Sequence, residues 1–543
     1  MKFTLSPKVK SLIIKASKFV AKPITIQPVF FLLLYVLFNV LDIYSLSVIH
    51  FKDPLFHGPW LKIAYGFILC YLLLLPVIVL PSKMRVVYKG AVMLFAIAFF
   101  AIDLYLLYLY DETFNTICID AIAALLATNP QEASEFVNAY FAVDVLVAIL
   151  FIISLLLALF YYLNRIILRW NFKKEFFIFA FMLISLIVSV AQFEKIIDTN
   201  FYYLITAEYP DLREYRQNPE IVSGEQGPEK VVLIIGESFV KTHSSLYGYE
   251  KTTNPLLAAI RNDSSLFVYK NVTSYAMTTI PAVKSLITAY TEEMEDSIEW
   301  FQCLTLLEVM QKSGYKTSWL SNQSKRGFHD NEVGRFSELC DEAFYAGDEY
   351  SGRYKYDLDE GLFPYLDSCL NRSVGKHFIV IQLMGSHTHY EKRYPATSGK
   401  FVPGDYDLTH QRLSDKNRQI IAHYDNTVLY NDSIVYEMMN RFSGDDAAVI
   451  YLSDHGQDVF ESSNDFAGHA RFGSEVSAAA ARNIPLMIYT TPLFKEKHGN
   501  MQELIEQSVD KPYRSDSIMY TVMDLVGIDL VNGVSYKHKS LFR

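Results

Sequence analysis

The most constraining feature of this 543-residue chain is that its long apolar stretches all lie before about residue 195. A helix needs about 20 mostly apolar residues to cross the hydrocarbon core of a bilayer. Five stretches meet this requirement, whereas the chain after residue 205 reads as an ordinary mixed globular sequence. We therefore predict a transmembrane domain over residues 1–195 and a soluble domain beyond it. The predicted spans are Pro28–Ile49, Leu61–Leu80, Gly90–Tyr110, Ala142–Leu163 and Glu175–Gln192.

Basic residues mark alternate connections between these spans and so indicate the orientation of the chain. The first and third connections are nearly free of Lys and Arg. The positive-inside rule therefore places the N-terminus in the cytoplasm and everything after residue 193 across the membrane. If one stretch were a buried core helix instead, the topology would reverse. The basic residues are Lys2, Lys8, Lys10, Lys15, Lys18, Lys22, Lys83, Arg85, Lys89, Arg165, Arg169, Lys173 and Lys174.

Two connecting segments have their own character. Residues 111–141 contain a helix-like stretch, Ile117–Ala127, which fits a helix lying at the far membrane surface, although a solvated loop fits the pattern equally well. Residues 196–229 are polar and contain several Pro and Gly residues. We interpret them as the linker to the domain formed by residues 230–543.

The soluble domain alternates short apolar runs with longer mixed segments. Such continuous runs are typical of buried parallel strands, and the segments between them suit covering helices. The pattern therefore predicts an α/β domain with a mostly parallel sheet sandwiched by helices. The predicted strands are Val231–Ile235, Phe378–Met384, Ala447–Leu452 and Pro485–Tyr489.

Charge excludes one class of partner. Most of the net charge of −10 lies in the soluble half, which has no basic strip. Because nucleic-acid binding depends on neutralising phosphates with Lys and Arg, we predict no nucleic-acid partner.

Four cysteines would face an oxidising compartment in the predicted topology, so disulfides are allowed. The sequence alone leaves their pairing open, and we favour Cys303 with Cys340. The other two are Cys118 and Cys369.

Three of the predicted strands end in residues that can bind metal or phosphate. Ligands of open α/β sheets bind beyond the carboxyl ends of strands, so these residues are expected to converge. Glu, Asp and His are also the mixture that a catalytic zinc site accepts. Each residue alone is more often structural, but together they predict a metal site. They are Glu237, His387, Asp454 and His455.

With these motifs in place, the soluble half resembles the membrane-anchored phosphoethanolamine transferases of the alkaline phosphatase/sulfatase superfamily. The resemblance runs through the soluble domain in order to the region of His469, and a five-span anchor is typical of that family. The branch that modifies lipopolysaccharide core sugars is the most similar. The segments that carry it are VVLIIGESFVKTHSSLYGYEKTTNP (Val231–Pro255), NVTSYAMTTIP (Asn271–Pro281), GSHTHYEKRYP (Gly385–Pro395), YDNTVLYND (Tyr424–Asp432) and SDHGQDVF (Ser453–Phe460).

The resemblance implies a nucleophilic Thr at a zinc ion. It points to Thr279, with Thr278 as the rival. Glu237, Asp454 and His455 would hold the zinc, and Thr279 would be its fourth ligand. Zinc stabilises the alkoxide of a Thr hydroxyl, which is otherwise a poor nucleophile.

The implied reaction has two half-reactions through a covalent phospho-threonine. Thr279 attacks the phosphorus of phosphatidylethanolamine and diacylglycerol leaves; an acceptor hydroxyl then displaces Thr279. His387 and His469 match the family's histidines beside the phosphate, which can also bind a second zinc.

Substrate contacts are implied less completely. Lys325 is a candidate phosphate contact, and Thr128 and Glu132 could meet the ethanolamine head group. The family pattern has an Asn four residues before that Thr, where this chain has Ala124.

The resemblance further implies a multi-pass protein of a Gram-negative inner membrane, with the catalytic domain in the periplasm. The donor would be a lipid of that membrane, and the acceptor a lipopolysaccharide (core sugar or lipid A) or another periplasmic glycan. Two other hypotheses stay open: a phosphoglycerol transferase of the lipoteichoic-acid or periplasmic-glucan type, and a metal-free lipid-binding module. A sulfatase would need a C/S-x-P-x-R segment at the nucleophile, and none is present.

Overall fold

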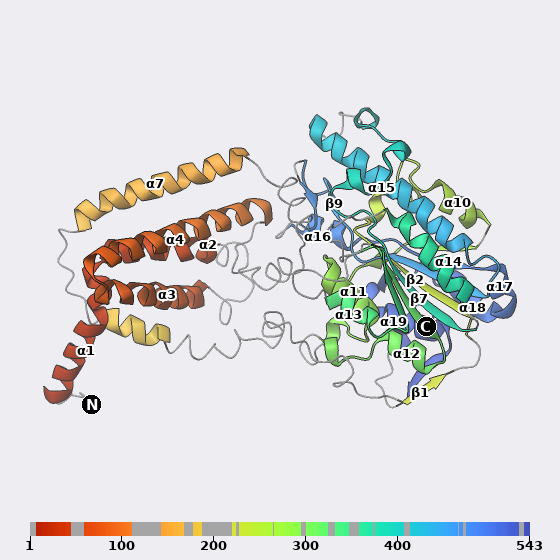
Figure 1. Ribbon diagram of the computed structural model, residues 1–543, viewed down its shortest axis with the longest axis horizontal. Helices are drawn as coiled ribbons and strands as arrows, with labels where there is room; N and C mark the ends of the chain where they lie inside the picture. Colours follow the sequence, from red (N-terminus) through yellow and green to blue (C-terminus); the bar gives the residue numbers. More distant parts are fainter. Residues whose placement is uncertain are drawn as a thin grey trace. The chain divides into compact units, whose positions relative to one another are not determined.

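The computed structural model describes two compact units, a helical unit before residue 206 and a sheet-containing unit after it (Figure 1). The described residues are 7–44, 59–110, 143–167, 178–186, 220–223 and 227–543, without 264, 295–299, 324–331, 347–357, 373–374, 407–412, 465, 471–473 and 532–536.

Helices of this unit overlap each of the first four predicted spans. Within its described ranges, three segments are long and apolar enough to cross a membrane: Lys62–Val79, Ser82–Leu107 and Val145–Tyr162. Residues 178–186, also helical, are the only described part of the fifth predicted span, so the count of five stays a prediction. The helices are α1 (Pro7–Ile26), α2 (Pro28–Tyr44), α3 (Pro59–Val79), α4 (Ser82–Tyr110) and α7 (Val143–Ile167).

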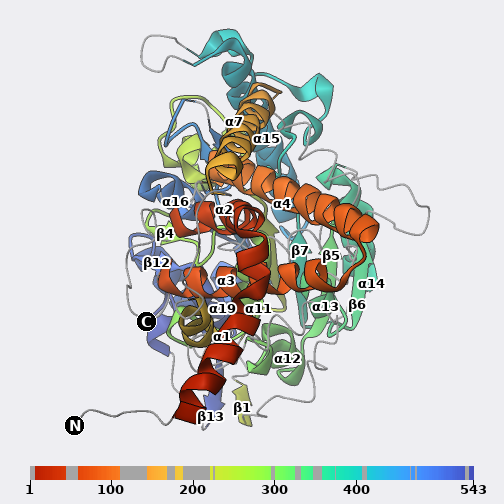
Figure 2. The same ribbon diagram turned by 90° about the vertical axis from the view of Figure 1, so that its left-hand side faces the viewer.

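A sharp bend separates α1 from α2. The two helices meet at 76° and would add a fourth span if they cross together; Figure 2 shows this bend. Pro28 begins α2, as expected of a residue whose fixed φ suits the first helical position and whose missing N–H is not needed there. Behind it, Leu34 and Leu37 are fully buried against the neighbouring helices.

A seven-stranded mixed sheet forms the centre of the second unit, in the order β3-β11-β8-β2-β7-β5-β6. All four predicted strands are present and buried along their whole length. The bounds are β2 (Lys230–Gly236), β3 (Leu266–Tyr269), β5 (Lys316–Ser321), β6 (Glu342–Tyr345), β7 (His377–Gln382), β8 (Ala447–Ser453) and β11 (Leu486–Thr490).

One strand direction was predicted wrongly. β11 pairs antiparallel with both β8 and β3, whereas β8, β2, β7, β5 and β6 are parallel to one another. The apolar run at 485–489 could not reveal this, because a strand buried on both faces is equally apolar in either direction. The sheet is therefore mixed, with its parallel part around β2.

Helices cover both faces of this sheet: α10, α14 and α15 lie on one side and α11, α12 and α19 on the other (Figure 1). The helices of this unit are α10 (Pro255–Asn262), α11 (Thr279–Ile287), α12 (Leu306–Lys312), α13 (Glu332–Ser337), α14 (Phe363–Arg372), α15 (Asp415–Asn440), α16 (Glu475–Arg482), α17 (Pro492–Lys497), α18 (Gly499–Gln507) and α19 (Ile518–Leu525). Three small strand pairs flank them: β1 (Glu220–Ser223) with β13 (Ile528–Val531), β4 (Val272–Thr273) with β12 (Tyr513–Arg514), and β9 (Asp458–Val459) with β10 (Ala467–Gly468).

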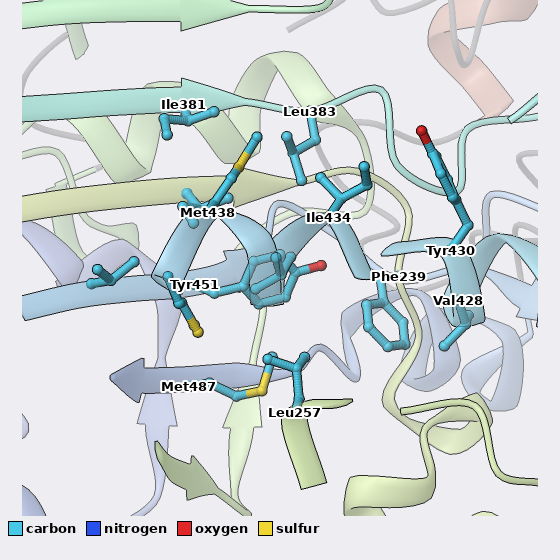
Figure 3. Packing of buried hydrophobic residues seen from close by; sticks show 14 of the residues in the cluster. Phe239, Leu257, Ile381, Leu383, Val428, Tyr430, Ile434, Met438, Tyr451 and Met487 are labelled. Atoms are coloured by element: carbon cyan, nitrogen blue, oxygen red, sulfur yellow. The ribbon is translucent and has the colours of Figure 1, made fainter. Parts of the chain in front are cut away.

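The long helix α15 supplies much of the core beneath the site. Ser414 caps its first turn by accepting a hydrogen bond from the backbone N–H of Asn417. Figure 3 shows Ile434 and Met438 of this helix among Ile381 and Tyr451 of the sheet. These side chains belong to one continuous buried cluster that packs against the central strands.

The favoured disulfide is absent. Cys303 and Cys340 are not joined by a disulfide in the structure. Cys340 lies just beyond α13, and its thiol points back to the carbonyl of Phe336 in that helix, at 4.0 Å. Cys118 lies outside the described residues.

We expect Met438→Ala to lower the free energy of unfolding by about 2–5 kcal/mol, because it removes a fully buried side chain from a close-packed core. Leu504→Ala is the control, since 38% of that side chain is already exposed. Denaturant unfolding of the detergent-solubilised protein measures both; equal losses would contradict this view of the core.

Candidate metal and nucleophile site

The site begins at the pairing of two parallel strands. In the register of β2 and β8, Gly236 lies opposite Ser453, so the next residues, Glu237 and Asp454, leave the same edge of the sheet side by side. The backbone N–H of Asp454 donates to the carbonyl of Gly236 at 3.0 Å, which continues the pairing one step further. The predicted convergence of strand ends is confirmed for Glu237, Asp454 and His455, whose ligand atoms all lie within 4.8 Å of one another.

These three buried side chains have the chemistry of a metal site. His455 Nε2 lies 3.4 Å from Glu237 Oε1 and 3.5 Å from Asp454 Oδ2. His455 Nδ1 donates to the carbonyl of Gly456 at 2.7 Å, which leaves Nε2 of the neutral imidazole with its lone pair facing the carboxylates. Asp454 Oδ2 is buried without a hydrogen-bond partner. An unpartnered carboxylate oxygen, an imidazole lone pair and a second carboxylate fit zinc, with room for a fourth ligand.

Without a cation, the cluster holds protons instead. Burial, reinforced by the charge of Glu237, raises the pKa of Asp454 to about 7. Burial opposes the charged form of His455, but the charges of Asp454 and Glu237 outweigh it and raise its pKa to about 9. Burial likewise opposes ionisation of Glu237, yet its hydrogen bond to His455 and the charges of His455 and His387 hold its pKa well below the usual range. The two buried carboxylates are therefore stabilised by a bound proton or another positive charge.

Thr279 lies at this cluster and Thr278 does not contact it. Thr279 is the first residue of α11, and its Oγ1 lies 3.3 Å from Glu237 Oε2 and 3.4 Å from His455 Nε2. Thr278 precedes the helix with an exposed side chain that makes no capping hydrogen bond. The N-terminus of α11 also carries the partial positive charge of the helix dipole, which favours an anion at Thr279.

Two further predicted histidines lie at the same site. The rings of His469 and His455 are 4.9 Å apart between centroids. Burial, with the positive charges of His455 and His387, lowers the pKa of His469 to about 3, so its imidazole is neutral at ordinary pH. His387 follows β7, is half-buried and is close enough to affect the pKa of both Glu237 and His469.

Several residues that shape the site were missed from the sequence. Gln323 donates from Nε2 to Glu237 Oε2 at 2.8 Å. It lies two residues beyond β5, so its signal was the same strand-end position that marked Glu237. Asp359 accepts hydrogen bonds from the backbone of Met384 and Gly385 and fixes the turn that carries His387, a role without any local sequence signal.

Three predicted substrate contacts, Lys325, Thr128 and Glu132, lie outside the described residues, as does the predicted surface helix at 111–141.

A comparison of the sequence with protein-family models identifies the family of the unit that contains this site. The sulfatase family model matches residues 229–528, which is more than half of the chain. The chain therefore belongs to the sulfatase family.

Two curated proteins are similar to this chain over most of its length. Phosphoethanolamine transferase EptC of Escherichia coli K12 is 25% identical over 490 residues, covering 84% of this chain and 82% of that protein. Phosphoethanolamine transferase CptA of Salmonella typhimurium is 26% identical over 493 residues, again covering 84% and 82%.

Solved structures give the same fold. The zinc complex of the periplasmic domain of E. coli EptC superposes with a TM-score of 0.54 at 26% identity, covering 60% of this chain and 89% of that one. The integral membrane protein EptA of Neisseria meningitidis superposes with a TM-score of 0.56 over 92% of this chain and 95% of its own, at 19% identity.

We expect zinc affinity to rise with pH, because zinc and protons compete for the cluster. Binding should release protons from Asp454 and His455, whose pKa values are both raised, and the number released should fall as the pH rises. Titration calorimetry of the detergent-solubilised protein in two buffers with different protonation enthalpies measures this release. An affinity independent of pH would contradict the proton assignment.

Proposed function

We propose that this protein is a zinc-dependent phosphoethanolamine transferase. It would move phosphoethanolamine from phosphatidylethanolamine to a lipopolysaccharide acceptor, either a core sugar or lipid A. The main observation behind the proposal is that the Thr279 hydroxyl lies beside the possible metal ligands Glu237, Asp454 and His455. Relatives that cover most of the chain bear the name of this activity.

Glu237, Asp454 and His455 would hold the zinc, with Thr279 as the fourth ligand. These side chains fit a zinc ion because two buried carboxylates need a positive charge nearby and Asp454 Oδ2 has no hydrogen-bond partner. Zinc, when bound, supplies positive charge that lowers the pKa of a neighbouring hydroxyl and offsets charge on phosphate oxygens. The zinc complex of the EptC domain supports this choice of metal.

In the first half-reaction, Thr279 Oγ1 loses its proton and attacks the phosphorus of the donor lipid. The phosphorus–oxygen bond to diacylglycerol breaks, and diacylglycerol leaves with a proton. In the second, the acceptor hydroxyl loses its proton and attacks the phosphorus of the phospho-threonine, the phosphorus–oxygen bond to Thr279 breaks, and Thr279 Oγ1 regains a proton. Two separate displacements let one site serve a lipid donor and a sugar acceptor in turn.

His387 and His469 would act beside the phosphate. Both side chains would lie where they can contact phosphate oxygens and exchange a proton with the attacking or leaving oxygen. The same pair would form a second zinc site if two ions bind. Lys325 would contact phosphate, and Thr128 and Glu132 the ethanolamine.

The helical unit would anchor the enzyme in the inner membrane of a Gram-negative bacterium. Five spans, over 28–49, 61–80, 90–110, 142–163 and 175–192, would leave the N-terminus in the cytoplasm, with a linker at 196–229. The catalytic domain, 230–543, would then lie in the periplasm. The alternation of basic residues supports this orientation. An anchor in the membrane that contains the donor lipid keeps site and donor together.

We expect Thr279→Ala to lower transfer of ethanolamine-labelled head group by at least about a thousandfold, because it removes the nucleophile. Thr278→Ala is the matched control and should retain most activity, since its hydroxyl is exposed. Intact-mass analysis of the wild type, incubated with phosphatidylethanolamine alone, should show one added phosphoethanolamine, located on Thr279.

Two outcomes would contradict this reaction. Modification of Thr278 would move the nucleophile by one residue. Transfer of glycerol phosphate without ethanolamine would replace the proposed activity by that of a phosphoglycerol transferase.

We expect lipopolysaccharide from cells with the gene to carry phosphoethanolamine that is missing from cells with a deletion or with the Thr279→Ala variant. Mass spectrometry after mild acid hydrolysis separates lipid A from core sugar and identifies the acceptor part. Unchanged lipopolysaccharide in all three strains would exclude this acceptor class.

A further inference from the structure

A single buried residue, Ser238, contacts both carboxylates of the cluster. Its backbone N–H donates to Asp454 Oδ1 at 3.1 Å, and its side-chain hydroxyl donates to Glu237 Oε1 at 2.6 Å. The residue is fully buried, so no solvent competes for these bonds. Neither contact could be expected from the sequence, where Ser238 is only the residue after Glu237.

The backbone of Ser238 has a strained conformation at the point where it makes both contacts. Its φ is 57°, in the left-handed region that non-glycine residues rarely adopt. Such strain persists only where surrounding contacts enforce it, and it is concentrated at functional sites. Here Tyr424 enforces it, since its hydroxyl donates to the carbonyl of Ser238 at 2.8 Å and accepts from the N–H of Val240 at 2.8 Å.

A second chain of hydrogen bonds fixes the direction of the Ser238 hydroxyl. Gln457 Nε2 donates to Ser238 Oγ at 3.0 Å, so the single hydroxyl proton is left for Glu237. The orientation of the Gln457 amide is set in turn by Tyr390, whose hydroxyl donates to Gln457 Oε1. Both Tyr390 and Gln457 are buried.

These contacts decide which oxygens remain for a metal. Asp454 Oδ1 is taken by the N–H groups of Ser238 and His455, which leaves Oδ2 unpartnered. Glu237 Oε1 is held by Ser238, while Oε2 faces Thr279 and Gln323. Carboxylates that are oriented in advance lose less freedom when they bind a metal.

We propose that Ser238, with its hydroxyl oriented by Gln457, is a positioning residue that presents Glu237 and Asp454 to a divalent metal ion. The inference rests on the proposed metal binding by this cluster. Ser238 does not touch substrate; it acts through the two carboxylates.

The test compares Ser238→Ala with Ser238→Gly in the full-length protein in detergent. Both remove the hydroxyl, but glycine relieves the strain at positive φ and alanine keeps it. We expect zinc affinity, measured by competition with a chromogenic chelator, to fall about 10- to 100-fold in both variants. The melting temperature of the metal-free protein should be higher for Ser238→Gly than for Ser238→Ala. The two variants would then differ in melting temperature but show a similar loss of zinc affinity.

Two controls sharpen the result. Ser508→Ala also removes a fully buried serine hydroxyl, one that donates to the carbonyl of Ile505 at 2.9 Å, and should leave zinc affinity unchanged. Gln457→Met removes the amide donor at similar volume and should weaken zinc by a smaller factor, because the Ser238 hydroxyl is then free to rotate.

Wild-type affinity in Ser238→Gly would overturn the inference, since it would show that Ser238 serves only the fold. The inference would also fail if Ser238→Ala lost zinc affinity and melting temperature together while Ser238→Gly kept the wild-type values of both. If the wild type itself binds no zinc, the proposed function fails instead.

Discussion

Two buried carboxylates brought side by side are the constraint on which the rest of the sheet-containing unit depends. The parallel pairing of β2 with β8 sets Glu237 beside Asp454, and their like charges repel in a place where water cannot screen them. The repulsion is relieved by a proton on Asp454, by a protonated His455 or by a metal ion. The buried centre of the sheet therefore carries an unfavourable pair of charges, next to the large hydrophobic cluster.

The backbone at Gly385, after β7, lies in close contact with the backbone of Glu237. Gly385 follows β7 with a φ of 49°, and a Cβ there would lie only 2.8 Å from the carbonyl oxygen of Glu237. Glycine is therefore required both by conformation and by space. The turn that carries His387 can thus lie directly against the segment that carries Glu237, and Asp359 fixes it there. The geometry of the site comes from three strand ends locked together, with little freedom left to the side chains.

The sequence predicted what depends on local pattern and missed what depends on tertiary contact. Continuous apolar runs located β2, β7, β8 and β11, and strand ends located Glu237, Asp454 and His455. The direction of β11 was missed because burial on both faces looks the same either way. The hydrogen bonds of Gln323 and Gln457 to the site were missed because they cross between elements far apart in the chain. Thr279 came from family resemblance; spacing alone would not have separated it from Thr278.

The order of the strands has a consequence for how the chain reaches its folded state. β2 is the first strand of the large sheet to be synthesised, yet its two partners, β7 and β8, come more than a hundred residues later. Ser238 and Asp454 are 216 residues apart. During synthesis the apolar run VVLII has no native partner for a long interval, and unpaired apolar strands are prone to aggregate. The nascent chain therefore exposes this apolar strand until β7 and β8 have been synthesised, and the cluster of Glu237, Asp454 and His455 can form only after that point.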